Sequence, residues 1–271
     1  MTQYPINSSH ESLTAYGQPL ETVGKNYGEP QGREVIVKVH HCGVCHSDVH
    51  LHDGYFDLGN ERKFPVNALH HLPHTLGHEV EGEVVAVGPD VSNAQPGDRR
   101  IVYAWIGCES CHLCNAGNGH LCNKPRQIGI NTDGGFATHI HIPDEQYLLN
   151  YDGIAPEQAG SYMCAGLTAF GALKKIRNRT ERGPVLIIGA GGVGLMALQF
   201  AMQLFHEPPI VAEIDPQKKE LAMKLGAKSV IDPKDRDARK ALIRDSGGGL
   251  AGVVDFVGNT QSVDFGVACL G

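Results

Sequence analysis

The pattern of apolar and polar positions divides the chain into two regions. In the first, which ends near Tyr151, short apolar or alternating runs are separated by turn residues. These runs predict strands at residues 34–40, 79–87, 100–104 and 134–142. Short strands between frequent turns are typical of an antiparallel, loop-rich β domain, which we place at residues 1–155.

The second region, residues 156–271, alternates strand patterns with helix patterns. Strands are predicted at 184–188, 210–214, 229–231 and 252–257, and helices at 157–175, 193–204, 216–225 and 260–270. Strands that alternate with helices indicate a parallel sheet with helices on both faces. The predicted fold class is therefore α/β, with an antiparallel β domain followed by a doubly wound parallel sheet.

The predicted parallel sheet is smaller than usual. A dinucleotide-binding sheet of this kind has about six strands, whereas only about four are recognisable before Gly271. We therefore expect an incomplete sheet domain, either because the chain is a fragment or because its C-terminal part is lost.

The composition is that of a globular protein. Apolar residues make up 41% of the 271 positions and charged residues 20%, which allows sizeable cores. The net charge is −7 and no long basic run is present, which argues against nucleic acid or an anionic membrane as a partner. The N-terminal segment is polar, and no apolar run approaches about 18 residues. We expect a cytoplasmic protein.

Cysteine and histidine residues form two kinds of potential metal site. Four cysteines follow a C-x2-C-x2-C-x7-C spacing: Cys108, Cys111, Cys114 and Cys122. In a reducing cytoplasm, cysteines at such spacings are metal ligands more often than disulfide partners. Four thiolates complete a tetrahedron around zinc and leave no position for substrate, so this cluster predicts a structural site.

Three further potential ligands, Cys45, His78 and Cys164, are dispersed along the chain. Such a set needs the whole fold to bring it together, and it leaves one position open for water or substrate, as in catalytic zinc sites. Cys42 and Cys45 also fit half of a structural zinc site, but no second pair has a matching spacing. Cys42 and Cys269 are expected to be small buried apolar residues.

A glycine-rich run lies between a predicted strand and a predicted helix. Its residues are Gly189, Ala190, Gly191, Gly192, Val193 and Gly194, a G-x-G-x-x-G pattern. Alone, such a run also fits a tight turn in an unrelated α/β domain, but this position is the one that dinucleotide binding requires. The glycines let the backbone approach a pyrophosphate at the helix N-terminus.

An acidic residue is expected about 20 positions after this run, where it binds the ribose. Glu213 follows Gly194 by 19 positions, and Asp215 is the alternative. A carboxylate accepts hydrogen bonds from the ribose 2′-hydroxyl and repels a 2′-phosphate, so NAD is favoured over NADP. Lys218 either lies along the adenosine ribose or is a solvated helix residue, and the sequence leaves both interpretations open.

The motifs occur in an order that resembles one enzyme family. CGVCHSD at 42–48, GHEVEGEVVAVG at 77–88, the four-cysteine spacing, CAGLTAF at 164–170 and GAGGVG at 189–194 are similar to the zinc-containing medium-chain alcohol dehydrogenases. The similarity extends from about residue 20 to residue 271. It implies a GroES-like β domain followed by a Rossmann-type dinucleotide-binding domain.

The resemblance also implies how a metal is held. Cys45, His78 and Cys164 match the protein ligands of a catalytic zinc, and the four clustered cysteines match those of a structural zinc. Asp48 and Glu79 match carboxylates that orient the metal ligands. Two zinc ions per chain are therefore expected.

Four further roles follow from the resemblance alone. Ser47 matches the hydroxyl that takes the substrate proton, and His50 matches the imidazole that ends this relay. His46 matches a pyrophosphate contact, and Thr168 a residue near the nicotinamide.

The function that the resemblance implies is zinc-dependent oxidation of an alcohol to an aldehyde or ketone, and the reverse, with hydride transfer to NAD. The expected partner is a small alcohol or aldehyde, and the full-length form is expected to be a homo-oligomer. Two alternatives stay open. One is a polyol or formaldehyde-type dehydrogenase of the same superfamily, and the other, suggested by the short sheet, is a non-catalytic zinc-binding fragment.

Some residues match no family role. His70, His71 and His74 lie in a proline-containing insertion, and we expect them to be solvated or to line a substrate channel rather than to form a third metal site. Trp105 and Tyr55 either line a substrate pocket or pack in the core.

Overall fold

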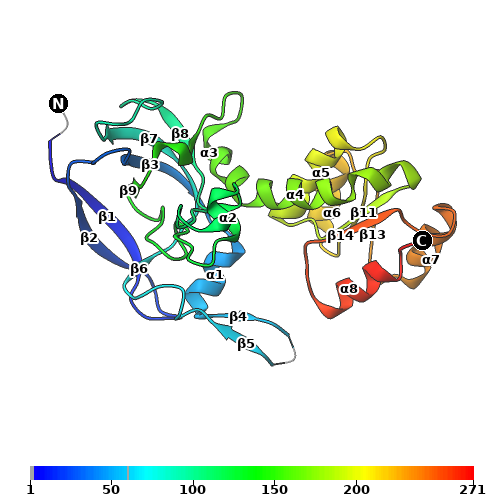
Figure 1. Cartoon of the computed structure of the whole chain (residues 1–271). Helices are drawn as coiled ribbons and strands as arrows, with labels where there is room; N and C mark the ends of the chain where they lie inside the picture. Colours follow the sequence, from blue (N-terminus) through cyan, green and yellow to red (C-terminus); the bar gives the residue numbers. More distant parts are fainter. Residues whose placement is uncertain (1–2, 60) are drawn as a thin grey trace. The chain divides into compact units, whose positions relative to one another are not determined.

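The computed structural model describes residues 3–59 and 61–271 of the chain. These residues divide into two compact units, unit 1, which ends at Cys164, and unit 2, which begins at Ala165. Figure 1 traces both from the N-terminus to the C-terminus. Each unit has its own apolar core.

Unit 1 is built on antiparallel sheets, as predicted. Its strands are β1 (Ile6–Leu13), β2 (Glu21–Tyr27), β3 (Val35–Gly43), β4 (Tyr55–Asp57), β5 (Lys63–Pro65), β6 (His74–Thr75), β7 (Glu79–Val87), β8 (Arg99–Val102), β9 (His139–Ile142) and β10 (Leu148–Leu149). The largest sheet has the strand order β10-β8-β7-β3-β9, and a second has the order β2-β1-β6. Every pairing in these two sheets is antiparallel.

Strands β3 and β7 form the buried centre of the larger sheet. Val35 and Val37 of β3 and Val80 and Val84 of β7 have no exposed surface, and they pack with Ile140 of β9. Each such side chain contributes about 1.5–3 kcal/mol of burial. This core therefore fixes the first residues of β7.

Short helices connect the strands of unit 1. They are α1 (His46–Asp53), α2 (His112–Asn115), η1 (Gly119–Leu121), η2 (Glu145–Tyr147), α3 (Pro156–Ala159) and η3 (Gly160–Met163). Helix α1 and strands β1 and β2 were not predicted, because their sequences are mostly polar and lack a clear apolar period.

The predicted strand at 134–142 is wrong in its first half, because β9 begins only at His139. Residues 134–136 form a loop instead. The amide of Gly134 donates to the carbonyl of Thr75 at 2.8 Å, and that of Phe136 donates to the carbonyl of Leu76 at 2.9 Å. These bonds hold the loop against the segment that leads to His78.

The helix predicted at 157–175 is wrong as a single element. It is divided into α3, η3 and α4 (Ala165–Ile176), because the backbone at Cys164 (φ −124°, ψ −78°) leaves the helical region. Helices α3 and η3 pack on β3 and β7. They therefore lie in unit 1, whereas the sequence placed its domain boundary at residue 155.

Unit 2 has a four-stranded sheet with the order β13-β12-β11-β14, and all its pairings are parallel. The strands are β11 (Val185–Ile188), β12 (Ile210–Ala212), β13 (Ser229–Ile231) and β14 (Gly252–Asp255). The remaining helices are η4 (Arg177–Arg182), α5 (Gly192–Leu204), α6 (Pro216–Lys224), α7 (Arg236–Asp245) and α8 (Thr260–Val267). Helix α7 was not predicted, and α8 ends three residues earlier than predicted.

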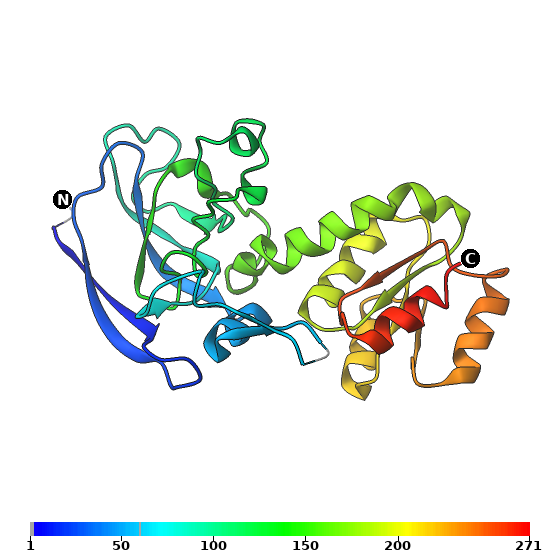
Figure 2. The ribbon, with the colours of Figure 1, turned by 60° about the horizontal axis from the view of Figure 1, so that its bottom comes forward.

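Helices cover both faces of this sheet (Figure 2). Strand β11 shows why. Val185 and Ile187 pack with α4 and α5, whereas Leu186 and Ile188 pack with Leu242 of α7 and with α8. A strand that is buried on both faces is typical of a doubly wound sheet, so the predicted fold class is confirmed.

The close approach of η3 to β7 depends on Gly160. A Cβ atom at this position would lie 2.2 Å from the carbonyl oxygen of Glu79. We expect Gly160→Ala to destabilise unit 1 by about 1–3 kcal/mol, because the backbone of β7 cannot move without disturbing its core. Urea unfolding followed by the fluorescence of Trp105, the one tryptophan of the chain, measures this change. Gly24→Ala, at an open position of β2, is the matched control. Equal stability of the two variants would contradict the packing described.

Two of the three clustered histidines are buried. His70 and His74 stack with their ring centroids 4.0 Å apart, while His71 is exposed. Nδ1 of His70 donates to the carbonyl of Ile130 at 3.0 Å. Nε2 of His74 has no hydrogen-bond partner among the described residues. His70 and His74 are thus neither solvated nor part of a three-ligand cluster in the part of the chain that the structure describes.

Burial lowers the pKa of His74 to about 4, and the neighbouring His70 adds to this effect. Above pH 6.5 the folded and unfolded states both hold a neutral imidazole, so stability is full there. Between pH 6.5 and about 4 the unfolded state binds the proton more readily, so stability falls by roughly 2–3 kcal/mol. His74→Asn should therefore lose less stability than the parent chain between pH 7.5 and 5.5, as measured by urea unfolding. His71→Asn, with its exposed side chain, should retain the parental loss, and identical pH dependence of all three proteins would contradict this assignment.

Candidate metal centres and cofactor cleft

The four clustered cysteines meet at one point in unit 1. Cys111 precedes α2 and Cys114 lies within it, so the helix turn brings their sulfurs to 3.6 Å. Cys122 follows η1, with its sulfur 3.8 Å from that of Cys111, and the sulfurs of Cys108 and Cys114 are 4.0 Å apart. Zn–S bonds of 2.3 Å in a tetrahedron place sulfurs about 3.8 Å apart. Disulfide sulfurs lie at about 2.05 Å, so the geometry fits a metal.

Hydrogen bonds to the sulfur atoms favour the thiolate form of several cysteines in this cluster. The hydroxyl of Ser110 lowers the pKa of Cys108, and the backbone amide of Cys114 lowers that of Cys111. The amides of Cys108 and Lys124 both donate to the sulfur of Cys122 at 3.3 Å. Such donors stabilise the thiolates that bind zinc.

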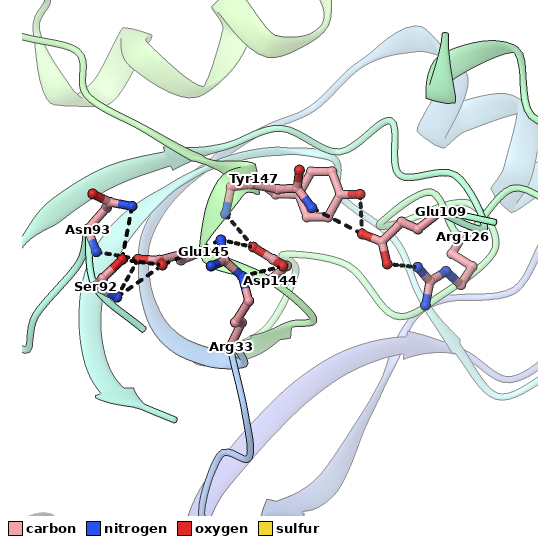
Figure 3. A network of polar contacts seen from close by, with 9 residues as sticks. Arg33, Ser92, Asn93, Glu109, Arg126, Asp144, Glu145 and Tyr147 are labelled. Carbon is pink, nitrogen blue, oxygen red and sulfur yellow. Dashed lines mark hydrogen bonds and ion pairs between the residues drawn. The ribbon is translucent and has the colours of Figure 1, made fainter. Parts of the chain in front are cut away.

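The loop of this cluster is fastened to unit 1 by Glu109 (Figure 3). Its carboxylate accepts from the hydroxyl of Tyr147 at 2.5 Å and from Nε2 of Gln146 at 3.2 Å, and it pairs with Arg126 at 3.0 Å. Arg126 also donates to the carbonyl of Gly107. The cluster is thus attached on both sides of Cys108.

The three dispersed residues also come together in unit 1. Cys45 lies between β3 and α1, His78 immediately before β7, and Cys164 immediately after η3. The sulfurs of Cys45 and Cys164 are 3.7 Å apart, close to the tetrahedral spacing. The potential ligand atoms of these three residues and of Glu79 all lie within 4.8 Å of one another. Residues from three segments therefore form one donor set.

The imidazole of His78 shows that this pocket fits a cation. Its side chain is buried, and neither ring nitrogen has a hydrogen-bond partner among the described residues. Nδ1 lies 3.3 Å from Oδ1 of Asp48, but the two are not aligned for a hydrogen bond. A buried polar atom without a partner is costly, and a metal at Nε2 would remove this cost.

Asp48 holds two of the converging segments. Its buried carboxylate accepts from the amide of Cys45 at 2.8 Å and from the amide of Gly77 at 3.1 Å. It also lies against His78 at the distance given above. A carboxylate beside a ligand histidine fixes the orientation of the ring, so Asp48 has the position of an orienting group.

The charges of the donor set depend on one another. The Cys164 thiol, followed by His78, lowers the pKa of Cys45, whereas the Cys45 thiolate and then burial raise that of Cys164. Burial opposes a charge on His78, but Asp48 and Cys45 outweigh it and raise its pKa. Burial also raises the pKa of Glu79. A cation would displace the protons that these groups share, as ligand residues require.

The two residues expected to form a proton relay lie on α1. Ser47 and His50 are one turn apart and partly exposed, and the structure records no hydrogen bond between them. The ring centroid of His50 lies 4.8 Å from that of His46 and 5.1 Å from that of Phe56. His46 is exposed and free to contact a ligand.

The glycine-rich run of unit 2 connects β11 to α5. A Cβ atom at Gly194 would lie 1.8 Å from the carbonyl oxygen of Gly189, so only glycine permits this turn. The amides at the start of α5 are then available to a phosphate. The predicted strand–turn–helix context of the run is therefore present.

The structure separates the two candidate acids. Glu213 is buried, and its carboxylate accepts from the amides of Ala190 at 2.7 Å, Ile214 at 2.7 Å and Asp215 at 3.0 Å. Although burial opposes its ionisation, these three bonds keep the pKa of Glu213 below its usual value. Asp215 instead caps α6 by accepting from the amides of Gln217 and Lys218.

A cleft of about 150 Å³ lies at the carboxyl ends of the parallel strands. Its lining residues are Ile188, Gly189, Ala212, Glu213, Ile214, Pro233, Lys234, Val257, Asn259, Gln261, Ser262 and Phe265. The strand order reverses between β11 and β14, and such a switch point is where doubly wound sheets bind ligands. Lys218 and Thr168 are exposed on α6 and α4 and do not line this cleft. No sequence motif marks the other cleft residues from the last part of the chain, which are Pro233, Lys234, Val257, Asn259, Gln261, Ser262 and Phe265.

Two further observations concern Trp105 and the length of the helices. The indole of Trp105 donates to the carbonyl of Met163 at 2.7 Å, so this residue is bonded within unit 1. In residues 3–59 and 61–271, no helix has both the length and the apolar character to cross a bilayer.

Comparisons with known proteins agree with this geometry. The family described as alcohol dehydrogenase GroES-like domain matches residues 31–152, and the family described as zinc-binding dehydrogenase matches residues 192–271. An NAD-dependent alcohol dehydrogenase of Sulfurisphaera tokodaii is 34% identical over 245 residues, which cover 90% of this chain and 70% of that protein. One of Sulfolobus acidocaldarius is 32% identical, with coverages of 91% and 70%.

A similar solved structure is the D-arabinose dehydrogenase of Sulfolobus solfataricus. It has a TM-score of 0.83 and 26% identity, and the match covers 98% of this chain and 78% of that one. The matches span both units of the chain and agree with the order of the motifs. The chain therefore belongs to the zinc-containing medium-chain alcohol dehydrogenase family.

Proposed function

We propose that this protein oxidises an alcohol to an aldehyde or ketone, and catalyses the reverse reduction, with zinc at the dispersed site and NAD as hydride acceptor. The observation that carries the proposal is the convergence of Cys45, His78 and Cys164 at one point of unit 1. The buried ring nitrogens of His78 have no hydrogen-bond partner there among the described residues. This donor set fits a catalytic zinc, because three ligands leave one position for substrate.

Two metals per chain follow from the two donor sets. Cys45, His78 and Cys164 would hold the catalytic zinc, and the four clustered cysteines would hold a structural one. When bound at the dispersed site, zinc supplies Lewis acidity that lowers the pKa of the alcohol. Asp48 would orient His78, and the carboxyl group of Glu79 lies beside the thiols.

The proton leaves through the residues of α1. Ser47 accepts the proton of the substrate hydroxyl, and His50, one turn further along and open to solvent, takes it from Ser47. His50 suits the last position because an imidazole changes its charge near neutral pH. This relay requires that Ser47 and His50 approach each other when substrate binds, because they share no bond in the structure.

The cofactor binds at the glycine-rich run and the adjoining cleft. The amides of Gly191, Gly192, Val193 and Gly194 would face the pyrophosphate, with His46 as a further contact. The carboxylate of Glu213 would accept a hydrogen bond from the ribose 2′-hydroxyl, and its negative charge favours NAD over NADP. Lys218 would lie along the ribose, and Thr168 near the nicotinamide. We further propose a cytoplasmic location, a small alcohol or aldehyde substrate and a homo-oligomeric full-length form.

A polyhydroxylated substrate, either a sugar or a sugar alcohol, is the second candidate, because one similar solved structure is that of a dehydrogenase of the sugar D-arabinose. A panel of simple alcohols, polyols and formaldehyde with a thiol separates the classes by NADH absorbance. Activity confined to polyols would replace the simple-alcohol substrate. No activity with any of them would favour a non-catalytic zinc-binding protein.

Metal analysis tests the two proposed zinc sites. We expect two zinc ions per chain by mass spectrometry of the metal content. Cys45→Ser and Cys111→Ser should each retain one, because each removes a thiolate from a different donor set. The far-UV circular dichroism of Cys45→Ser should equal that of the parent chain. One zinc ion in the parent chain would contradict the two-site proposal.

Ser47→Ala tests the proton relay. Loss of the hydroxyl should lower kcat for alcohol oxidation by roughly 100-fold, since general acid–base groups contribute about that much, while zinc content stays unchanged. Ser246→Ala, which removes a hydroxyl bonded to the carbonyl of Ile243 in unit 2, should leave kcat within about twofold. Parental kcat in Ser47→Ala would exclude Ser47 from the relay.

A further inference from the structure

Trp105 touches two of the segments that carry the dispersed donor set. Its Nε1–H donates to the carbonyl of Met163 at 2.7 Å, immediately before Cys164. Its ring meets that of His78 edge to face, with centroids 5.9 Å apart and an interplanar angle of 62°. One side chain thus joins the two segments, which lie far apart in the sequence.

The carbonyl of Met163 needs such a partner. Met163 is the last residue of η3, and carbonyls at the end of a helix have no N–H donor within that helix. The chain leaves the helical region at Cys164 before α4 begins at Ala165, so η3 does not continue past Met163. Met163 and Cys164 are both buried, which keeps water from replacing a lost donor. The hydrogen bond from the indole N–H therefore fixes the backbone immediately before Cys164, the residue whose thiol belongs to the dispersed donor set.

The backbone next to Trp105 is bonded to the loop of the four-cysteine cluster. The next residue, Ile106, is buried, and its carbonyl accepts from the amide of Arg126 at 2.8 Å. Arg126 pairs with Glu109 inside the cluster loop, as Figure 3 shows. The position of the indole is consequently tied to this loop.

We propose that Trp105 is a positioning residue, which fixes Cys164 relative to His78 so that the dispersed site holds its metal in one geometry. This inference rests on the proposed function, since it assumes a metal at that site. From the sequence, Trp105 was expected either to pack in the core or to line a substrate pocket. The positioning role goes beyond both expectations. Through Trp105, the loop of the four-cysteine cluster would also help to support the dispersed site.

Trp105→Phe is the informative variant, because it keeps an aromatic ring at this position and removes the N–H donor, although the phenyl ring is smaller than the indole. With Co²⁺ in place of zinc, the visible absorption bands of the dispersed site should shift, since they report ligand geometry. Zinc release from this site to a chromogenic chelator should become about three- to tenfold faster, the value of one buried hydrogen bond. Tyr103→Phe, which removes the hydroxyl of a nearby aromatic residue, is the matched control and should change neither quantity.

The phase of zinc release that belongs to the dispersed site is the one that Cys45→Ser removes. Parental bands and release rates in Trp105→Phe would overturn the positioning role. If Cys45→Ser removes one metal but Trp105→Phe changes nothing, only this inference fails. If Cys45→Ser retains both metals, the proposed function fails instead.

A measurement on the unaltered chain guards against a misfolded variant. Trp105 is the single tryptophan, so an indole ¹⁵N label gives one N–H signal in the NMR spectrum. This signal should exchange slowly with solvent and should shift when a chelator removes the metal of the dispersed site. Hydrogen exchange at the rate of an exposed indole would overturn the proposal. So would a chemical shift that does not change when the metal is removed.

Discussion

The account depends on one constraint, the short spacing that a tetrahedral metal site imposes on its ligands. Sulfur and nitrogen ligands must lie within about 4 Å of one another, yet Cys45, His78 and Cys164 come from three separate segments. The core of β3 and β7 fixes the first two, and Gly160 lets η3 approach β7 closely enough to bring in the third. The sheet of unit 1 is therefore the support of the proposed chemistry.

The two donor sets meet this constraint in different ways. The four clustered cysteines lie within one loop, and a helix turn and a few backbone hydrogen bonds suffice to gather them. The dispersed set requires Asp48, which bonds the amides of Cys45 and Gly77, and long-range packing. This difference explains why a closed, structural role suits the first set and an open, catalytic role suits the second.

Local patterns in the sequence predicted much of the fold. The central strand of unit 1 at 79–87 and the strand–turn–helix around Gly189 were predicted correctly, because apolar runs and turn residues determine them locally. The break at Cys164 was missed, since it follows from packing of η3 on β7 and leaves no mark in the helical pattern. The contact of Trp105 with Met163 joins residues 58 positions apart, and no spacing rule could reveal it. Likewise, only the hydrogen bonds show that Glu213 contacts the glycine-rich run whereas Asp215 caps α6.

The central claim is that the dispersed residues hold a second metal, distinct from the one in the four-cysteine cluster. Anomalous diffraction at the zinc edge, from crystals of the zinc-loaded chain, tests it most directly. The account predicts two peaks, one within bonding distance of Cys45 Sγ, His78 Nε2 and Cys164 Sγ and one among the four clustered cysteines. A single peak at the cluster, with His78 still without a ligand, would contradict it.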